Sequence, residues 1–237
     1  MLPLKKFLLS SLGKKYVMGV SGLALIGFLF MHLGGNILLY SPNPDHFNAY
    51  GAGLKGMLGP LFYPAEMSLF VLFVVHMAMA IYLHFVDKPK ARGAKYAAGQ
   101  KGKGGGSKWG WASVNMIVTG LVLTFFLVIH LYQIRYQWQF GTIHTTMLDG
   151  EEVINLHKYV ADLFKSPWMV AFYCGVMGYL MLHVRHGAWS AVQSLGAMKP
   201  EWSKAVYALS AIVAVGVAAG FFFFPLWFYF DIASKFQ

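Results

Sequence analysis

The sequence predicts an all-α integral membrane protein with five transmembrane helices, the first four of which form a bundle. Hydrophobic residues make up 57% of the 237-residue chain and charged residues only 12%, whereas soluble domains carry about 25% charged residues. The apolar residues come in long runs, without the alternation of a strand or the single apolar stripe of a soluble helix. So few polar side chains cannot keep a chain of this length dispersed in water, and we expect a lipid bilayer to be its solvent.

Five apolar runs are each long enough to cross a hydrocarbon core of about 30 Å, which takes about 20 helical residues. The first follows a basic start, as in a signal peptide. It is expected to be a retained helix, because the run is too long and no small-residue cleavage site closes it. Tyr and Trp near most of the ends are typical of interfacial anchors. The expected helices span residues 16–40, 63–86, 109–135, 168–192 and 205–230.

The basic residues predict the orientation of the chain. With the N-terminus inside, the inner segments hold 14 of the 19 Lys and Arg residues, and cytoplasmic segments carry such an excess. We therefore expect a multi-pass protein of the cell's inner (cytoplasmic) membrane with a cytoplasmic N-terminus. The net charge of +10 lies mainly in these segments, which argues against a nucleic-acid partner.

The two longest connections differ in character. The inner connection, residues 87–108, is basic and glycine-rich, which predicts a flexible linker that contacts anionic lipid headgroups. A docking surface for an acidic cytoplasmic subunit is the alternative. The outer connection, residues 136–167, is expected to include a short interfacial helix around 154–164. No internal repeat and no separate soluble domain is predicted, so residues 1–237 form a single membrane domain.

Four of the nine histidines lie well inside the apolar runs, one in each of the first four predicted helices: His32, His76, His130 and His183. A histidine in hydrocarbon is unfavourable and faces a bundle interior, a cavity or a cofactor. Given the rise of 1.5 Å per residue, His32 and His130 form an outer pair, and His76 and His183 form an inner pair.

Paired intramembrane histidines predict haem. A neutral imidazole is a good iron ligand, and two axial imidazoles complete the coordination of a haem held between helices. We therefore expect two b-type haems in the four-helix bundle. The single cysteine and the lack of a CxxCH sequence argue against covalently attached haem.

Three further residues lie near the inner pair. His84 and His186 are alternative ligands, or they contact a haem propionate, for which Arg185 is a third candidate. His76 and His183 are preferred as the ligands. His46, His144 and His157 fall in outer connections, where a solvated histidine is expected.

The chain resembles the dihaem cytochrome b membrane anchor of succinate dehydrogenase and fumarate reductase, in its single-chain, five-helix form. The stretches that carry the resemblance are HLGGNILLY, DHFNAYG, VVHMAMAIYLH, LVIHLY and LHVRHGAWSAVQSLG. The resemblance implies that His32 and His130 hold the outer haem and that His76 and His183 hold the inner one. It also implies that the first histidine of LHVRHG is the ligand.

The same resemblance implies partners. A flavoprotein subunit and an iron–sulfur subunit would bind on the cytoplasmic side, and a quinone, most often menaquinone in this family, would react near the outer haem. The chain would thus be the quinone-reactive subunit of a succinate:quinone oxidoreductase, with no dicarboxylate site of its own. The physiological direction and dimerisation of the complex stay open.

Quinone chemistry needs a proton carrier and hydrogen-bond donors near the ring. Glu66 is the acid placed within an apolar run, and partial burial there disfavours its charged form, which suits proton exchange. An interfacial glutamate that points into headgroups is the alternative. His46, Asn48 and Tyr50 are weaker candidates from the adjoining loop.

Two other functions compete with this one. The first is a dihaem quinone cytochrome of another complex, of the formate dehydrogenase, nitrate reductase or hydrogenase type. The second is a non-haem transporter or structural membrane protein whose histidines relay protons or join helices. The scarcity of intramembrane acids and bases argues against a coupled transporter.

Overall fold

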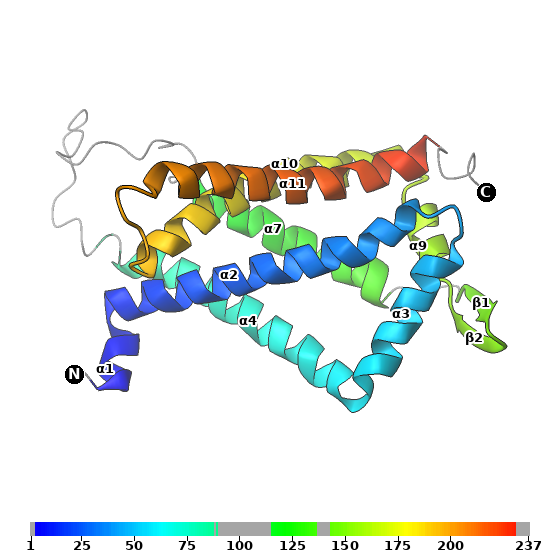
Figure 1. Ribbon diagram of the computed structural model, residues 1–237, viewed down its shortest axis with the longest axis horizontal. Helices are drawn as coiled ribbons and strands as arrows, with labels where there is room; N and C mark the ends of the chain where they lie inside the picture. The colour runs from blue at the N-terminus through cyan, green and yellow to red at the C-terminus, as the bar shows by residue number, and fades with distance from the viewer. Residues whose placement is uncertain (1–2, 88, 90–114, 137–142, 231–237) are drawn as a thin grey trace. The chain divides into compact units, whose positions relative to one another are not determined.

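The computed structural model describes residues 3–87, 89, 115–136 and 143–230 (Figure 1). Five of its helical segments are long and apolar enough to cross a membrane, which confirms the predicted all-α membrane fold with five spans. Their main helices are α2 (Ser11–Asn36), α4 (Phe62–Tyr82), α7 (Met116–His130), α10 (Pro167–Ser194) and α11 (Ser203–Tyr229).

Three of these helices change their winding at the C-terminal end. A 3₁₀ helix, η1 (Ile37–Tyr40), follows α2. Two π-helical segments, η3 (Leu83–Asp87) and η4 (Leu131–Tyr136), follow α4 and α7. Such π segments are rare and are frequent at functional sites; here η3 contains His84 and η4 begins directly after His130.

Large apolar side chains on these helices are exposed, which is the arrangement that a lipid environment favours. Phe125 is 63% exposed, Val128 65% and Ile212 68%. In water such surface would drive association, whereas lipid tails are as apolar as these side chains. Pro225 lies buried inside α11, a position that membrane helices tolerate because neighbouring groups satisfy the freed backbone.

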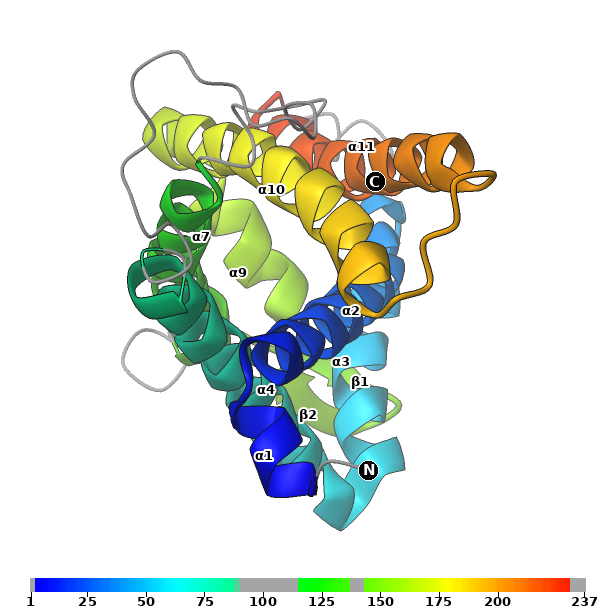
Figure 2. The same ribbon diagram turned by 90° about the vertical axis from the view of Figure 1, so that its left-hand side faces the viewer.

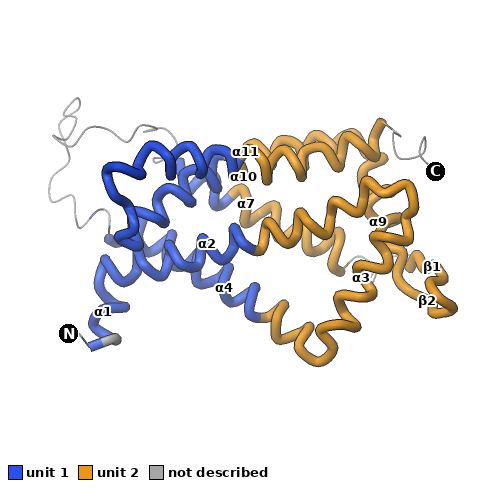
Figure 3. The backbone as a smooth tube through the Cα atoms, viewed as in Figure 1, with its two compact units in different colours: residues 1–27, 68–121, 182–214 blue, residues 28–67, 122–181, 215–237 orange. Residues whose placement is uncertain are grey.

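The chain divides into two compact units (Figure 3). Unit 1 comprises residues 1–27, 68–121 and 182–214, and unit 2 comprises residues 28–67, 122–181 and 215–237. Each of the five long helices contributes one part to each unit. The histidines are therefore divided too: His76 and His183 belong to unit 1, and His32 and His130 to unit 2.

In unit 1, the N-terminal part of α2 is fixed by polar contacts. A short helix, α1 (Leu4–Leu9), ends at Ser10, whose hydroxyl accepts a hydrogen bond from the backbone N–H of Gly13 at 3.0 Å. Lys14 forms an ion pair with Asp87 at the end of η3, with Nζ 3.3 Å from Oδ2, and lies 3.9 Å above the Tyr82 ring. These contacts join the start of α2 to the end of the second span.

In unit 2, the chain after η1 (SPNPDHFNAYGAG) is helical from Asp45 onward, although it lies between two of the predicted membrane helices. Helix α3 (Asp45–Leu58) begins where the Asn43 side chain accepts a hydrogen bond from the Asp45 N–H at 2.9 Å. It ends at Gly59, whose φ of 49° suits a glycine, and the 3₁₀ turn η2 (Gly59–Leu61) leads into α4. The three glycines of α3 weaken a helix by themselves, so its packing against α9 (Leu156–Leu163) supports it.

A β-hairpin precedes α9 and was not predicted. Strands β1 (Thr145–Leu148) and β2 (Glu151–Ile154) pair antiparallel, with Leu148 opposite Glu151. The turn is Asp149–Gly150, with φ of 51° and 84°, which is the Asp-Gly pattern of a tight hairpin turn. Strand β2 packs against α3, and both views show the hairpin beside that helix (Figures 1 and 2).

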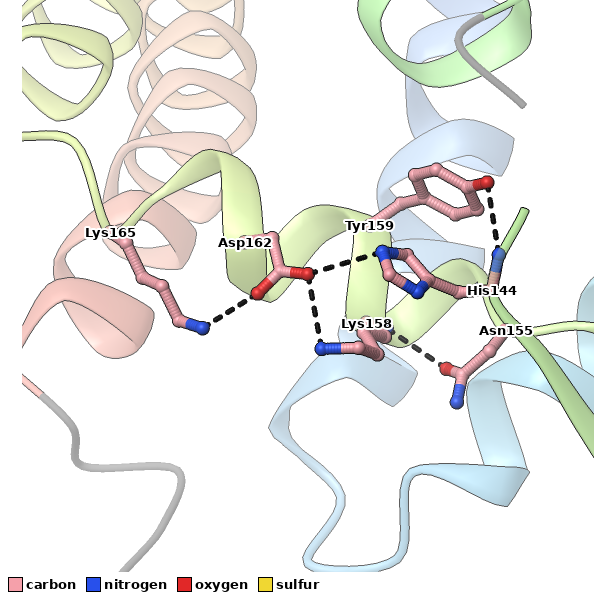
Figure 4. A network of polar contacts seen from close by, with 6 residues as sticks. All are labelled: His144, Asn155, Lys158, Tyr159, Asp162 and Lys165. Atoms are coloured by element: carbon pink, nitrogen blue, oxygen red, sulfur yellow. Dashed lines mark hydrogen bonds and ion pairs between the residues drawn. The ribbon is translucent and has the colours of Figure 1, made fainter. Parts of the chain in front are cut away.

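A polar network joins His144, the residue before β1, to α9 (Figure 4). The Asp162 carboxylate contacts Lys165 at 2.7 Å, Lys158 at 3.1 Å and His144 Nε2 at 3.5 Å. Burial alone raises the pKa of Asp162, but the hydrogen bonds from Lys165 and Lys158 outweigh it and hold that pKa below its usual range. The Tyr159 hydroxyl accepts a hydrogen bond from the His144 N–H at 3.2 Å.

The buried Asn48 side chain holds α3 against α9. It donates to Asn155 Oδ1 at 3.2 Å, and its own Oδ1 accepts from the backbone N–H of His157 at 3.0 Å. His157 is only 6% exposed and packs against the Phe228 ring with centroids 5.2 Å apart. The expectation of a solvated loop histidine is therefore wrong for His157, because α9 turns that side chain inward.

Candidate functional site

In unit 1, α4 and α10 bring the rings of His76 and His183 together. The ring centroids lie 6.3 Å apart, and the ring planes are inclined by 70°. His183 is thus a ring that faces His76. A helix side chain is fixed in direction by its backbone, so the two helices position both imidazoles.

Each of these imidazoles is hydrogen-bonded through Nδ1 to a buried hydroxyl on a third or fourth helix. His76 Nδ1 lies 3.2 Å from Ser21 Oγ on α2, and His183 Nδ1 lies 3.0 Å from Thr119 Oγ1 on α7. Both residues are buried: Ser21 is 2% exposed and Thr119 is 4% exposed.

A glycine follows each hydroxyl residue and lies close to the same ring. A Cβ atom on Gly22 would lie 3.1 Å from His76 Cε1, and one on Gly120 would lie 3.5 Å from His183 Cε1. The first spacing is tighter than ordinary van der Waals contact, and the second is an ordinary contact. The absence of a side chain at residue 22 therefore lets the His76 ring lie against α2.

In unit 2, α2 and α7 bring His32 and His130 together. Their ring centroids are 5.9 Å apart and their planes are inclined by 78°. Each ring stacks on a phenylalanine one turn earlier in its own helix: Phe28 with His32 and Phe126 with His130, both at 5.4 Å. The stacking limits rotation of both imidazoles.

The polar contacts of this second pair are unequal. His130 Nδ1 lies 3.4 Å from the Tyr173 hydroxyl, which donates to Gln133 Oε1 at 2.8 Å. His32 Nδ1 instead lies 3.3 Å from the amide nitrogen of Asn36, which also donates to the His32 carbonyl at 2.7 Å. With the amide in this orientation, His32 Nδ1 accepts a hydrogen bond, whereas His130 donates one.

The spacing of both pairs fits a shared metal. A metal–imidazole bond is about 2.0–2.1 Å, so two imidazoles on opposite sides of one metal have centroids about 6 Å apart. Edge-to-face aromatic pairs have similar spacings, and the contacts of His76 and His183 Nδ1 with hydroxyls are what favour a ligand pair in unit 1. Among the described residues, no group of three or more His, Cys, Asp or Glu could hold a metal ion. A haem needs only two protein ligands, because its porphyrin supplies the other four.

The remaining candidates near His183 have contacts of their own. Arg185 Nη2 donates to the Tyr207 hydroxyl at 2.9 Å, and its guanidinium lies 4.9 Å from the centre of the Tyr207 ring. The His84 ring packs edge-on against Phe85 at 4.8 Å. Arg185 is thus tied to α11, while His183 and not its neighbour His186 forms the ring pair with His76.

Glu66 has a partner that the sequence did not reveal. Arg135 Nε donates to Glu66 Oε1 at 2.7 Å and Arg135 Nη2 donates to Oε2 at 3.2 Å, so both carboxylate oxygens are engaged. The Arg135 side chain is 27% exposed and the Glu66 side chain is 37% exposed. The Arg135 guanidinium thus holds the Glu66 carboxylate by two charge-assisted hydrogen bonds.

The three weaker quinone candidates have different surroundings. His46 is exposed, and its Nδ1 lies 2.7 Å from Ser41 Oγ. The Tyr50 ring lies directly against Gly35, where a Cβ would clash with it. Asn48 is buried, and its amide is engaged by α9, so the structure gives it a structural role.

Sequence reasoning missed the hydrogen-bond partners of the histidines, and it also missed a repeat. Residues 18–32 (MGVSGLALIGFLFMH) and 116–130 (MIVTGLVLTFFLVIH) are identical at 8 of 15 positions. The repeat aligns Ser21 with Thr119 and His32 with His130, so the prediction of no internal repeat is wrong. This alignment was the available signal for the two hydroxyls.

The chain matches none of the protein-family models, curated proteins or solved structures to which it was compared. A function is therefore inferred from the two histidine pairs and their surroundings. Both pairs lie in apolar helices, and both present imidazoles from different helices to one another. This arrangement is suited to axial ligation of a flat cofactor.

Proposed function

We propose that the chain is a membrane cytochrome b that holds two b-type haems, one between His76 and His183 and one between His32 and His130. The observation that carries the proposal is the pairing of four intramembrane histidines from four helices, at ring separations of 6.3 Å and 5.9 Å. A haem held by either pair would carry single electrons.

The chain's own residues support this chemistry in three ways. Ser21 and Thr119 hold the Nδ1 atoms of the first pair, so that Nε2 is available as a ligand atom. Phe28 and Phe126 stack on the imidazoles of the second pair. The apolar helices exclude water, which affects the reduction potential of a bound haem.

The second pair requires one local rearrangement. A histidine that binds iron through Nε2 carries its proton on Nδ1, and in His32 that nitrogen faces the Asn36 amide nitrogen. A flip of the amide in place would bring Oδ1 against the His32 carbonyl oxygen, to which Nδ2 now donates at 2.7 Å. We therefore expect the Asn36 side chain to move away from His32 Nδ1 when His32 is a ligand.

We further propose that the complex is a succinate dehydrogenase or fumarate reductase, with a flavoprotein and an iron–sulfur subunit on the cytoplasmic side. The proposal rests on the ordered motifs around the four histidines and on the excess of basic residues in the inner segments. The basic connection 87–108 lies mostly outside the described residues. Electrons would pass between the iron–sulfur subunit and membrane quinone, most simply menaquinone, through the two haems.

The quinone site is proposed near Glu66, with Arg135 as part of it. A guanidinium beside a carboxylate offers N–H donors to a quinone oxygen and keeps the carboxylate in place. Proton exchange would then proceed with exchange of hydrogen-bond partners between Glu66, Arg135 and the quinone. Mutation of Glu66 to Gln should lower quinone reduction while both haems remain bound.

The test of the central proposal is an optical spectrum. Dithionite-reduced minus oxidised spectra of the purified protein should show low-spin b-type bands, with two haems per chain. A colourless protein that is folded would refute it. The identity of the complex is tested separately, by co-purification of flavin and iron–sulfur subunits with succinate-dependent quinone reduction; molybdenum or nickel subunits in their place would assign another dihaem complex.

A further inference from the structure

We propose that Ser21 and Thr119 are positioning residues that fix the tautomer of His76 and His183, so that both present an unprotonated Nε2 to one iron. The inference deepens the proposed function and rests on it. It concerns unit 1, where α2 and α7 each contribute one hydroxyl to a histidine of another helix.

The direction of each hydrogen bond follows from the number of protons available. A hydroxyl has one proton to donate and two lone pairs to accept with. Ser21 Oγ donates its proton to the Met18 carbonyl at 3.1 Å, and Thr119 Oγ1 donates to the Met116 carbonyl at 3.0 Å. With the hydroxyl protons on these carbonyls, only lone pairs of the two oxygens face the imidazoles, and Nδ1 of each histidine is then the donor.

This direction sets the state of the other ring nitrogen. In a neutral imidazole one nitrogen carries the proton and the other carries the lone pair. Since Nδ1 carries the proton in His76 and His183, Nε2 is the ligand atom in both. The hydrogen bond from Nδ1 also makes the imidazole a stronger electron donor to a bound metal.

The two hydroxyls are buried, which makes them difficult to replace by water. Ser21 is 2% exposed and Thr119 is 4% exposed. A serine or threonine that only satisfies its own helix has no need to face a histidine 55 or 64 residues away in the sequence. Here each hydroxyl oxygen both contacts a carbonyl of its own helix and faces a histidine of another helix, and this is true of Ser21 and of Thr119.

The repeat makes the positions of Ser21 and Thr119 equivalent in the sequence. Met18, Ser21 and Gly22 align with Met116, Thr119 and Gly120. In both copies the backbone acceptor is three residues before the hydroxyl, and a glycine that approaches the ring comes directly after it. Two copies of one arrangement, each aimed at a member of the same histidine pair, point to a role in the pair and not to chance packing.

The second pair lacks this arrangement. His130 has the Tyr173 hydroxyl as its partner, and His32 has the Asn36 amide. The Ser21 and Thr119 hydroxyls therefore act on the haem held by His76 and His183, whereas a different hydroxyl, that of Tyr173, faces His130. This specificity allows each haem to serve as the internal control for the other.

The experiment compares Ser21→Ala and Thr119→Val with a matched control, Ser210→Ala. Ser210 is a buried serine of unit 1 whose hydroxyl donates to the Val206 carbonyl at 2.8 Å. Each protein is purified with haem bound, and haem content, low-temperature EPR spectra of the ferric haems and redox titrations are measured.

We expect both test variants to change the low-spin EPR signal of one haem and to raise its midpoint potential, because a weaker imidazole donor stabilises ferric iron less. The other haem and the Ser210→Ala protein should be unchanged. Ser21→Thr and Thr119→Ser keep the hydroxyl and should restore the wild-type values, and they serve as the comparison if either truncated variant does not fold.

Three results would overturn the inference. They are wild-type spectra in both truncated variants, equal shifts of both haems, or a changed signal in the variants that keep the hydroxyl. A wild-type protein without haem would refute the proposed function itself, and this result is seen before any variant is made.

Discussion

Substitution of Gly22 and Gly120 by alanine should have different effects, although the two glycines are equivalent in the repeat. A Cβ at residue 22 would lie 3.1 Å from His76 Cε1 and 3.5 Å from Nδ1. Carbon atoms pack best at about 3.5–4.0 Å, so the His76 ring has to move by roughly half an ångström. The hydrogen bond to Ser21 is already 3.2 Å long, and hydrogen bonds of this type weaken beyond about 3.2 Å.

The energies of the two substitutions can be compared. Overpacking in a tight site costs about 1–3 kcal/mol, while alanine is better than glycine in a helix by up to about 1 kcal/mol. Gly22→Ala should therefore destabilise the protein by roughly 0–2 kcal/mol. At residue 120 the new Cβ would lie 3.5 Å from His183 Cε1, an ordinary contact, so Gly120→Ala should be neutral or slightly stabilising.

The assay is thermal unfolding of the two variants in one detergent, with the absorption and EPR spectra of the bound haems as a second readout. Gly22→Ala should unfold at a lower temperature than wild type and should alter the signal of one haem. Gly120→Ala should do neither. Equal effects of the two substitutions would contradict the reasoning, since the difference of 0.4 Å in approach distance would then have no consequence.

Three other predictions follow from the same contacts. His76→Leu should reduce the haem content from two per chain to one, and the spectrum of the remaining haem should match that of the haem lost in a His32→Leu protein. Arg135→Lys removes a two-point contact with Glu66; because the pair is partly exposed, unfolding free energy should fall by no more than about 1 kcal/mol, while quinone reduction falls strongly. Burial lowers the pKa of His157, so the unfolded chain takes up a proton there before the folded one does, and stability should be full above about pH 6.5 and decrease as the pH falls below it. His157→Phe should lessen this loss in melting curves at pH 7.5 and 5.5, and an unchanged pH dependence would show that other groups cause it.

The five spans and the four histidines could be predicted because both signals are local. A run of about 20 apolar residues predicts a membrane helix by itself, and a histidine inside it, such as His130, is visible without knowledge of any neighbour. The Asp149–Gly150 turn was also a local signal. It lies between two membrane spans, outside the apolar runs that predict the fold.

The partners of the histidines could not be predicted in this way. Ser21 lies 55 residues from His76, and Thr119 lies 64 residues from His183. Contacts of this kind depend on how helices rotate and pack, which hydrophobic runs do not specify when helices are apolar on all sides. The ion pair of Glu66 with Arg135 is similar, because it needs η4 to direct the guanidinium toward α4.

The repeat accounts for the choice of pairs. It aligns α2 with α7 over 15 residues, so each of these two helices carries a buried hydroxyl followed by a histidine. The two aligned histidines, His32 and His130, face one another. His76 and His183 lie on α4 and α10, the spans that follow α2 and α7, and each contacts the hydroxyl of the span before it. A pair made of His32 and His76 would separate His32 from the histidine with which it aligns. The repeated hydroxyl and histidine of α2 and α7 therefore favour two sites, one for each of the observed pairs.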